Sequence, residues 1–286
     1  MRRIKKCTVF LLLLCLLLNL SGCAAAQKPL RVTLVLKTVT EVAEFWGTLL
    51  SGVEKAAEEY GVELKVLTSP REIDIDKQIE LIRQVTADKP DVMILSAADY
   101  DRCAEATEEA IAAGIGVVAI DTDVNAAGRA CFVGSNSYEI GLEMGRAMAS
   151  YLPEGGKVAV IQHMLTTTTG IERTRGVLDA LNEAGNIEIL GSFCCDNSTE
   201  QAQTITTELL SADPEIRGFV CTNEVCNVGA ANALVELGMG GRVYVVGCDN
   251  AQRQIQFLEQ NIIQAIVTQR PFNMGYVAVQ QAVRVA

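Results

Sequence analysis

Short apolar runs alternate along this chain with longer stretches whose apolar residues recur every three or four positions. The short runs are rich in β-branched residues and predict buried strands, while the longer stretches predict amphipathic helices. In the first part of the chain, strands are predicted at 31–37, 63–68, 91–95 and 117–120. Helices are predicted between them at 45–60, 76–88 and 103–113. Such alternation is typical of right-handed crossovers that build a parallel sheet.

The same alternation begins again after a pause at 121–135. Further strands are predicted at 157–162, 187–192, 218–221, 243–247 and 262–268, and further helices at 138–151, 171–184, 199–210, 225–237 and 252–259. Two successive units predict an α/β protein with two doubly wound parallel-sheet lobes joined by a hinge. The expected boundaries are 30–135 for the N-lobe, which is completed by about 270–286, and 136–269 for the C-lobe.

The first 23 residues have the layout of a removable leader. Its basic residues are Arg2, Arg3, Lys5 and Lys6. The apolar run at 7–18 is shorter than the ~20 residues that a bilayer-spanning helix needs, which favours a signal peptide over residues 1–22. Leu20-Ser21-Gly22-Cys23 resembles a bacterial lipobox, in which the cysteine is lipidated before cleavage. We therefore expect Cys23 to carry the lipid and 23–29 to form a tether; the alternative is an ordinary secretory signal with an incidental cysteine.

The charge of the chain excludes one class of partner. The formal net charge is −11, and the leader holds four of the 24 basic residues but none of the 35 acidic ones. The mature protein is therefore more acidic still. Such a surface repels phosphate backbones, so no nucleic acid is expected to bind. It also disfavours adhesion to anionic lipid, which leaves the acyl chains as the membrane anchor.

Ten cysteines suggest a disulfide scaffold, but their positions do not. Cys7 and Cys15 lie in the leader, and Cys23 is the expected lipidation site. The remaining ones are Cys103, Cys131, Cys194, Cys195, Cys221, Cys226 and Cys248. They are odd in number and mostly lie in apolar runs, where free cysteine packs as a small hydrophobe. No CxxC pair occurs, and adjacent cysteines fit tetrahedral coordination poorly, so neither a metal nor a cofactor is expected.

Polar residues follow several of the predicted strands. In open parallel sheets, ligands bind beyond the carboxyl ends of the strands. The residues at those ends are Asp121, His163, Asn223, Glu224, Asp249, Gln269 and Arg270. Carboxylates, amides and a guanidinium provide both hydrogen-bond acceptors and donors, which suits a ligand rich in hydroxyl groups.

Six short motifs at these positions resemble those of a known family. They are Ala119-Ile120-Asp121, Phe132-Val133-Gly134-Ser135-Asn136, Glu172-Arg173-Thr174-Arg175-Gly176, Asn223-Glu224, Val245-Val246-Gly247-Cys248-Asp249 and Ala265-Ile266-Val267-Thr268-Gln269-Arg270-Pro271. In this order and spacing, the chain resembles the type I periplasmic sugar-binding proteins, the ribose-binding group that feeds ABC transporters. The likeness covers nearly all of residues 31–286. It implies a monomeric extracytoplasmic lipoprotein that captures a small sugar or sugar-like ligand by lobe closure and delivers it to an ABC permease.

The resemblance also implies a set of ligand-binding residues. The polar ones are Asp121, Arg173, Asn223, Asp249 and Gln269. Phe45 and Trp46 match an aromatic pair whose flat faces pack against the apolar side of a sugar ring. From the residues alone, the two aspartates are equally consistent with helix caps, and the aromatic pair with a buried helix face.

The chain departs from the family pattern at several pocket positions. Ala43 replaces an asparagine, Thr122 replaces the arginine of ribose binders, and Asp196-Asn197 replaces an aromatic residue. A glycine-rich turn before a C-lobe helix is replaced by the threonine run at 166–169, which predicts a loop and a helix cap. The identity of the sugar therefore stays open, and ribose is not expected.

Functions other than sugar transport are also compatible with this sequence. The same pocket would suit a ligand-sensing receptor for a membrane kinase or chemoreceptor, or an autoinducer-binding protein. An enzyme is not expected, because the chain has one histidine, His163, and lacks the GxSxG, GxGxxG and GxxxxGK[ST] motifs. The chain stops inside a predicted helix at 275–286. Members of the family that it resembles usually continue with a short tail, so this sequence is compatible with a fragment.

Overall fold

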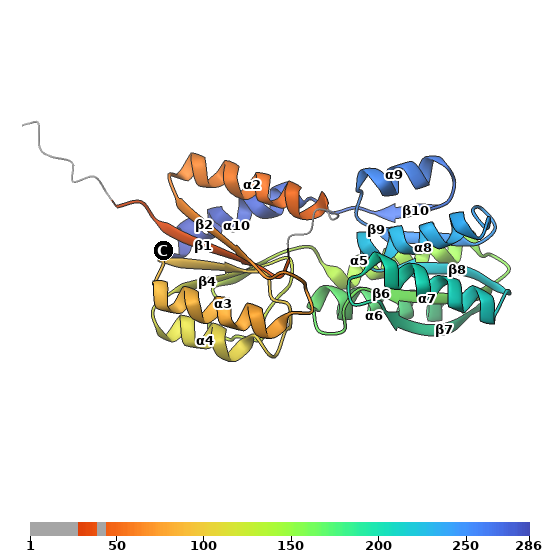
Figure 1. Cartoon of the computed structure of the whole chain (residues 1–286), viewed down its shortest axis with the longest axis horizontal. Coiled ribbons are helices and arrows are strands. Elements are labelled where there is room, and N and C mark those ends of the chain that lie inside the picture. The colour runs from red at the N-terminus through yellow and green to blue at the C-terminus, as the bar shows by residue number, and fades with distance from the viewer. Residues whose placement is uncertain (1–27, 39–43) are drawn as a thin grey trace, which may run out of the picture.

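The computed structural model describes residues 28–38 and 44–286, arranged as two α/β lobes side by side (Figure 1). The N-lobe is built on a parallel sheet whose strands are β1 (Arg31–Leu36), β2 (Glu63–Thr68), β3 (Val92–Leu95), β4 (Gly116–Ile120) and β5 (Cys131–Val133). The C-lobe sheet consists of β6 (Gly156–Gln162), β7 (Ile187–Cys194), β8 (Ile216–Cys221), β9 (Tyr244–Cys248) and β10 (Ala265–Val267). The predicted fold class is confirmed.

The two sheets repeat one topology. Their strand orders are β2-β1-β3-β4-β5 and β10-β9-β8-β6-β7, so in both lobes the second strand lies at one edge and the first strand beside it. This is the doubly wound order in which ligands bind where the strand order reverses. The short strand β5 lies inside the stretch that the sequence pattern predicted as a pause, and the pattern therefore missed it.

Helices cover both faces of each sheet. The N-lobe carries α2 (Glu44–Tyr60), α3 (Ile75–Asp88), α4 (Ala104–Ala112) and α10 (Pro271–Val285). The C-lobe carries α5 (Ser137–Tyr151), α6 (Thr168–Ala184), α7 (Thr199–Ala212), α8 (Glu224–Glu236) and α9 (Gln252–Glu259). In the N-lobe, α2 and α10 bury one face of the sheet, and α3 and α4 bury the other. In the C-lobe, α5 and α6 cover one face, while α7, α8 and α9 cover the other.

The chain crosses between the lobes more than once. It passes to the C-lobe between β5 and α5, and after β10 it returns, so the blue helix α10 lies among the orange elements of the N-lobe (Figure 1). Two glycines let α10 approach α2 closely. A Cβ on Gly275 would lie 2.1 Å from the Leu49 carbonyl oxygen, and one on Gly52 would lie 2.0 Å from the Phe272 carbonyl oxygen.

The seven cysteines of the described residues are free thiols, and five of them are buried. Cys195, Cys221 and Cys226 belong to the apolar core of the C-lobe, which fits the prediction of core thiols. Within residues 28–38 and 44–286, no helix combines the length and the apolar character that crossing a membrane requires. The predicted leader and Cys23 lie outside the described residues.

Candidate ligand-binding site between the lobes

Each lobe presents one buried aspartate at the end of a central strand. Asp121 follows β4 and Asp249 follows β9, and both have positive φ angles, of 61° and 75°. Aspartate tolerates this left-handed conformation better than most residues. The backbone N–H of Asp121 donates to the Val133 carbonyl, and that of Asp249 to the Val267 carbonyl. The side chains are only 5 % and 7 % exposed, so the two lobes offer equivalent buried carboxylates.

The two strand ends border one pocket, which residues of both lobes line together. The N-lobe lines it with Lys37, Phe45, Trp46, Glu72 and Asp121. The C-lobe lines it with His163, Thr169, Arg173, Asn197, Asn223, Glu224, Val225, Asp249 and Gln269. All seven residues predicted to bind the ligand are in this set, although their contact with a ligand stays a prediction.

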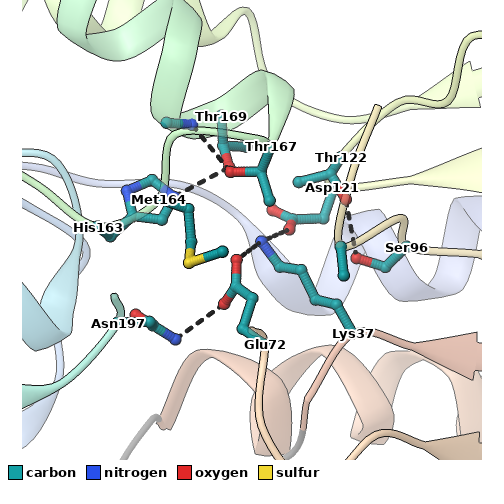
Figure 2. A network of polar contacts seen from close by, with 12 residues as sticks. Lys37, Glu72, Ser96, Asp121, Thr122, His163, Met164, Thr167, Thr169 and Asn197 are labelled. Atoms are coloured by element: carbon teal, nitrogen blue, oxygen red, sulfur yellow. Dashed lines mark hydrogen bonds and ion pairs between the residues drawn. The ribbon is translucent and has the colours of Figure 1, made fainter. Parts of the chain in front are cut away.

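Lys37 forms the centre of a buried ion cluster on the N-lobe side. Its Nζ lies 2.8 Å from Glu72 Oε1 and 3.4 Å from Asp121 Oδ2 (Figure 2). Burial lowers the pKa of Lys37, but the charges of Glu72 and Asp121 more than offset this, and the net pKa is raised. Lys37 is therefore a cation in the pocket wall.

Two successive hydrogen bonds connect this ion cluster to the C-lobe. Asn197 Nδ2 donates to Glu72 Oε2 at 2.8 Å (Figure 2), and Asn223 Nδ2 donates to Asn197 Oδ1 at 2.8 Å. Asn223 also caps α8, since its Oδ1 accepts from the Cys226 N–H at 3.0 Å. Asn223 therefore both caps a helix and lines the pocket.

Arg173 is a buried guanidinium with donors to spare. It lies on α6, is 3 % exposed, and its Nη1 donates to the Thr222 carbonyl at 2.9 Å. Its Nε has no hydrogen-bond partner among the described residues. A buried donor without a partner is costly, so a ligand oxygen that reached this nitrogen would be bound favourably.

His163 is held neutral beside the pocket. Its Nδ1 lies 2.7 Å from Thr222 Oγ1 and its Nε2 lies 3.2 Å from Thr169 Oγ1. Burial, helped by the positive charges of Lys37 and Arg173, lowers its pKa well below the usual 6.5. A neutral ring fixed by two hydroxyls positions Thr169 in the wall (Figure 2).

The aromatic pair belongs both to the pocket and to the N-lobe core. Trp46 is 5 % exposed and packs in the core cluster with Leu49 and Val53. The Phe45 and Trp46 rings meet edge to face with centroids 5.1 Å apart, and Lys37 Nζ lies 5.7 Å from the Trp46 centroid. Phe45 and Trp46 therefore pack in the core, as a buried helix face would, and they line the pocket as well.

The threonine run joins the lobes. Thr166 Oγ1 donates to the Ala98 carbonyl at 2.9 Å, and the Thr166 carbonyl accepts from the Tyr100 N–H at 2.9 Å. Thr168 Oγ1 accepts from the Asp123 N–H at 3.0 Å. Thr167 caps α6, as the sequence predicted, by accepting from the Gly170 N–H. The described conformation therefore has the lobes in direct contact beside the pocket.

Sequence reasoning missed two of the charged wall residues. Lys37 directly follows β1, which ends at Leu36, whereas the sequence pattern predicted a strand over 31–37. A strand predicted to end at residue 36 would have placed Lys37 among the strand-end residues. Glu72 lies in the loop between β2 and α3, where no periodic pattern marks it. Among the described residues, no group of three or more His, Cys, Asp or Glu side chains could hold a metal ion.

Comparisons with known proteins agree with this architecture. Residues 33–286 match the periplasmic binding protein domain family. A D-allose-binding periplasmic protein of Escherichia coli (strain K12) is 26 % identical over 268 residues, which cover 91 % of this chain and 84 % of the relative.

Two solved structures illustrate the likeness in three dimensions. A sugar transporter from Clostridium phytofermentans has a TM-score of 0.82 at 29 % identity, covering 88 % of this chain and 91 % of that one. An ABC transporter periplasmic solute-binding protein from Actinobacillus succinogenes 130z, with bound D-allose, has a TM-score of 0.82 at 27 % identity and covers 90 % and 91 %. The family match includes every residue that lines the pocket, and this chain therefore belongs to the periplasmic binding protein family, with the type I fold.

Proposed function

We propose that this protein is an extracytoplasmic solute-binding lipoprotein that captures a small sugar or sugar-like molecule between its lobes and delivers it to an ABC permease. The names of its relatives support a carbohydrate, since they bind D-allose or transport sugar. The family contains binding proteins, and the pocket is accordingly interpreted as a capture site.

The observation that carries the proposal is the composition of the pocket wall. Asp121 and Asp249 offer carboxylate acceptors, Arg173 offers an unpartnered Nε donor, and amides lie beside them. Vicinal hydroxyls match such mixed acceptors and donors. The Trp46 face supplies an apolar surface for the other side of a sugar ring.

Capture requires the lobes to separate and close. Most of the wall residues are buried in the described conformation, so we expect a ligand to enter when the lobes open. A hinge at the two lobe crossovers, near 134–136 and 268–270, would allow this motion. A bound sugar would then bridge Asp121 of the N-lobe and Arg173 of the C-lobe.

Membrane attachment is proposed to depend on the leader alone. Residues 1–22 would direct export, and lipidation of Cys23 would hold the mature chain at the outer face of the membrane. Residues 23–29 would then act as a short tether below the folded lobes.

A thermal-shift screen tests the sugar-binding function. The chain from residue 24 onward contains every described residue and would be tested with D-allose, D-ribose, D-arabinose, D-glucose and D-galactose. A ligand at a hundred times its Kd stabilises by about 2.7 kcal/mol, which raises the Tm by roughly 5–10 °C. Arg173→Ala should abolish the shift, while Arg175→Ala, an exposed arginine on the same helix, should keep it. Cooperative melting with no shift from any of these sugars or their amino derivatives would overturn the proposal.

A further inference from the structure

Glu224 is a buried carboxylate in the pocket wall that lacks a cationic partner. It begins α8, lines the pocket, and is 4 % exposed. Its Oε1 lies 3.4 Å from the Glu44 N–H at the start of α2, and the neighbouring Phe45 N–H also favours its charged form. Its Oε2 has no hydrogen-bond partner, and no ion pair reaches the side chain, among the described residues. Such a group is costly to bury unless something else satisfies it.

A second carboxylate makes this position still less favourable for an unpaired charge. Asp249 Oδ2 accepts from the Glu224 N–H at 3.1 Å, and Asp249 Oδ1 accepts from Gln269 Nε2 at 2.8 Å. Asp249 therefore has its own hydrogen bonds and offers Glu224 only its negative charge. Burial, followed by the charge of Asp249, raises the pKa of Glu224 to about 7.

The whole pocket carries more negative than positive groups. Its carboxylates are Glu72, Asp121, Glu224 and Asp249, and its cations are Lys37 and Arg173. Lys37 is already engaged by Glu72 and Asp121, at 2.8 and 3.4 Å. Arg173 is the cation that Asp249 stabilises, so the carboxylate left without a cation of its own is Glu224. A phosphorylated or carboxylated sugar would be repelled there, and a cationic group would be attracted.

We propose that Glu224 is a specificity-determining residue that selects an amino sugar, with the ligand ammonium donating to the unpartnered Oε2. The inference rests on the proposed sugar-binding function and names the substrate class of the same pocket. A sugar hydroxyl could donate one hydrogen bond to Oε2 but would leave the negative charge of Glu224 uncompensated. An ammonium supplies both the donor and the charge, and charge-assisted hydrogen bonds are the stronger kind.

The selection would operate on lobe closure. Glu224 belongs to the C-lobe, whereas the Glu44 N–H that holds its other oxygen belongs to the N-lobe. The carboxylate is therefore fixed in the wall only when the lobes meet. Nearby, the carboxylate of Glu44 accepts from the Gln252 N–H of the C-lobe at 3.2 Å. The Glu44 carboxylate therefore has a hydrogen-bond partner of its own across the lobes.

Isothermal titration calorimetry with matched sugar pairs tests the proposal. The probes are D-allose and 2-amino-2-deoxy-D-allose, D-glucose and D-glucosamine, and D-galactose and D-galactosamine. The wild-type protein should bind the amino member of at least one pair more tightly than its hydroxyl partner, by about tenfold or more. Glu224→Gln keeps the shape of the side chain but removes its charge, and it should abolish this preference, so that the amino and hydroxyl members of a pair bind with similar affinities.

Two further variants keep the test decisive. Glu236→Gln removes the same charge from an exposed position on the same helix and should leave the preference intact. Glu224→Asp keeps the charge but withdraws it by one methylene, and it should weaken amino-sugar binding without loss of folding. If hydroxyl sugars bind and their amino analogues bind no better, or if Glu224→Gln retains the preference, the assignment of Glu224 is wrong and the sugar-binding function stands. If no probe of either class binds the wild-type protein, the proposed function itself fails.

Discussion

Glu72 of the N-lobe accepts a hydrogen bond from Asn197 of the C-lobe at 2.8 Å, inside the wall of the ligand pocket. Closing the lobes therefore completes the partners of a carboxylate that is almost fully buried. We expect this contact to favour the closed state even without a ligand. In the open state, water solvates Glu72. In the closed state Glu72 is buried and would lack a hydrogen bond if Asn197 did not donate one.

Asn197→Ala should weaken sugar binding by about tenfold, because a buried acceptor left without its donor costs about 1–3 kcal/mol. Asn223 would also lose its contact with Asn197, although it would keep its helix-capping bond. Asn182→Ala, an exposed asparagine of the same lobe, is the matched control. The Kd from calorimetry, together with the radius of gyration from solution scattering, measures the effect. Equal affinities for the two variants would show that the bridge does not contribute to closure.

Lys37→Met should destabilise the protein by about 3 kcal/mol or more, because it leaves Glu72 and Asp121 buried without their cation. Urea unfolding measures this. Lys65→Met removes a lysine that pairs with Asp88 at the surface and should cost less than about 1 kcal/mol.

A second substitution shows whether the Lys37 effect is electrostatic. Adding Glu72→Gln to Lys37→Met removes one of the two carboxylates left unpaired. The double variant should therefore lose less stability than the sum of the single variants. Additive losses would indicate that Lys37 acts through packing alone.

The fold was predictable because its determinants are local. Apolar runs such as those of β3 and β9 are buried on both faces and contrast with the helical spacing of the segments between them. Strand β5 escaped the same reasoning because it has three residues, of which Phe132 is exposed, so no pattern distinguishes it from a loop. It is a strand because it pairs with β4.

The candidate site was predictable only where a strand end or a family motif marks it. Asp121 and Asp249 satisfy both conditions, and both line the pocket. Glu72 satisfies neither, because its place in the wall depends on how the loop after β2 meets Lys37 and Asn197. The hydrogen bonds of Thr166 to the N-lobe could not be predicted for a related reason. They depend on how the two sheets are oriented, which no pattern along the chain records.

Gly275→Ala should destabilise the protein by about 1–3 kcal/mol through overpacking, since its Cβ would lie 2.1 Å from the Leu49 carbonyl oxygen and force α10 away from α2. Gly47→Ala on α2 is the matched control, because a Cβ there meets nothing within 4 Å. It should stabilise the helix by up to about 1 kcal/mol. Chemical denaturation of the two variants measures both effects, and losses of similar size would contradict the close approach of the two helices.

Cys23→Ser should prevent lipidation, because the acyl chains are expected on this thiol. Since lipidation precedes cleavage, the variant should also keep its leader. The full chain would be expressed in a bacterial host, and detergent-phase partitioning with intact mass measurement would follow the lipid. Cys15→Ser, within the apolar part of the leader, should leave partitioning unchanged. A mature wild-type protein whose intact mass includes no acyl chains would exclude lipidation at Cys23.

Glu224 should make the stability of the ligand-free protein depend on pH in an unusual direction. Because burial and Asp249 raise its pKa from 4.5 to about 7, the native state holds a proton that the unfolded chain has already released between these values. The free energy of unfolding therefore falls as pH rises through that window.

The comparison with Glu224→Gln isolates this contribution. His163 has the opposite influence, since its pKa is lowered by burial and the native state resists its protonation below about 6.5, but both proteins contain it. The Tm of the wild-type protein minus that of Glu224→Gln should fall between about pH 4.5 and 7 and then level off. Thermal melts in a series of buffers measure it. Parallel curves for the two proteins would mean that Glu224 ionises as an exposed carboxylate does, because the wall around it is open to water in the absence of ligand.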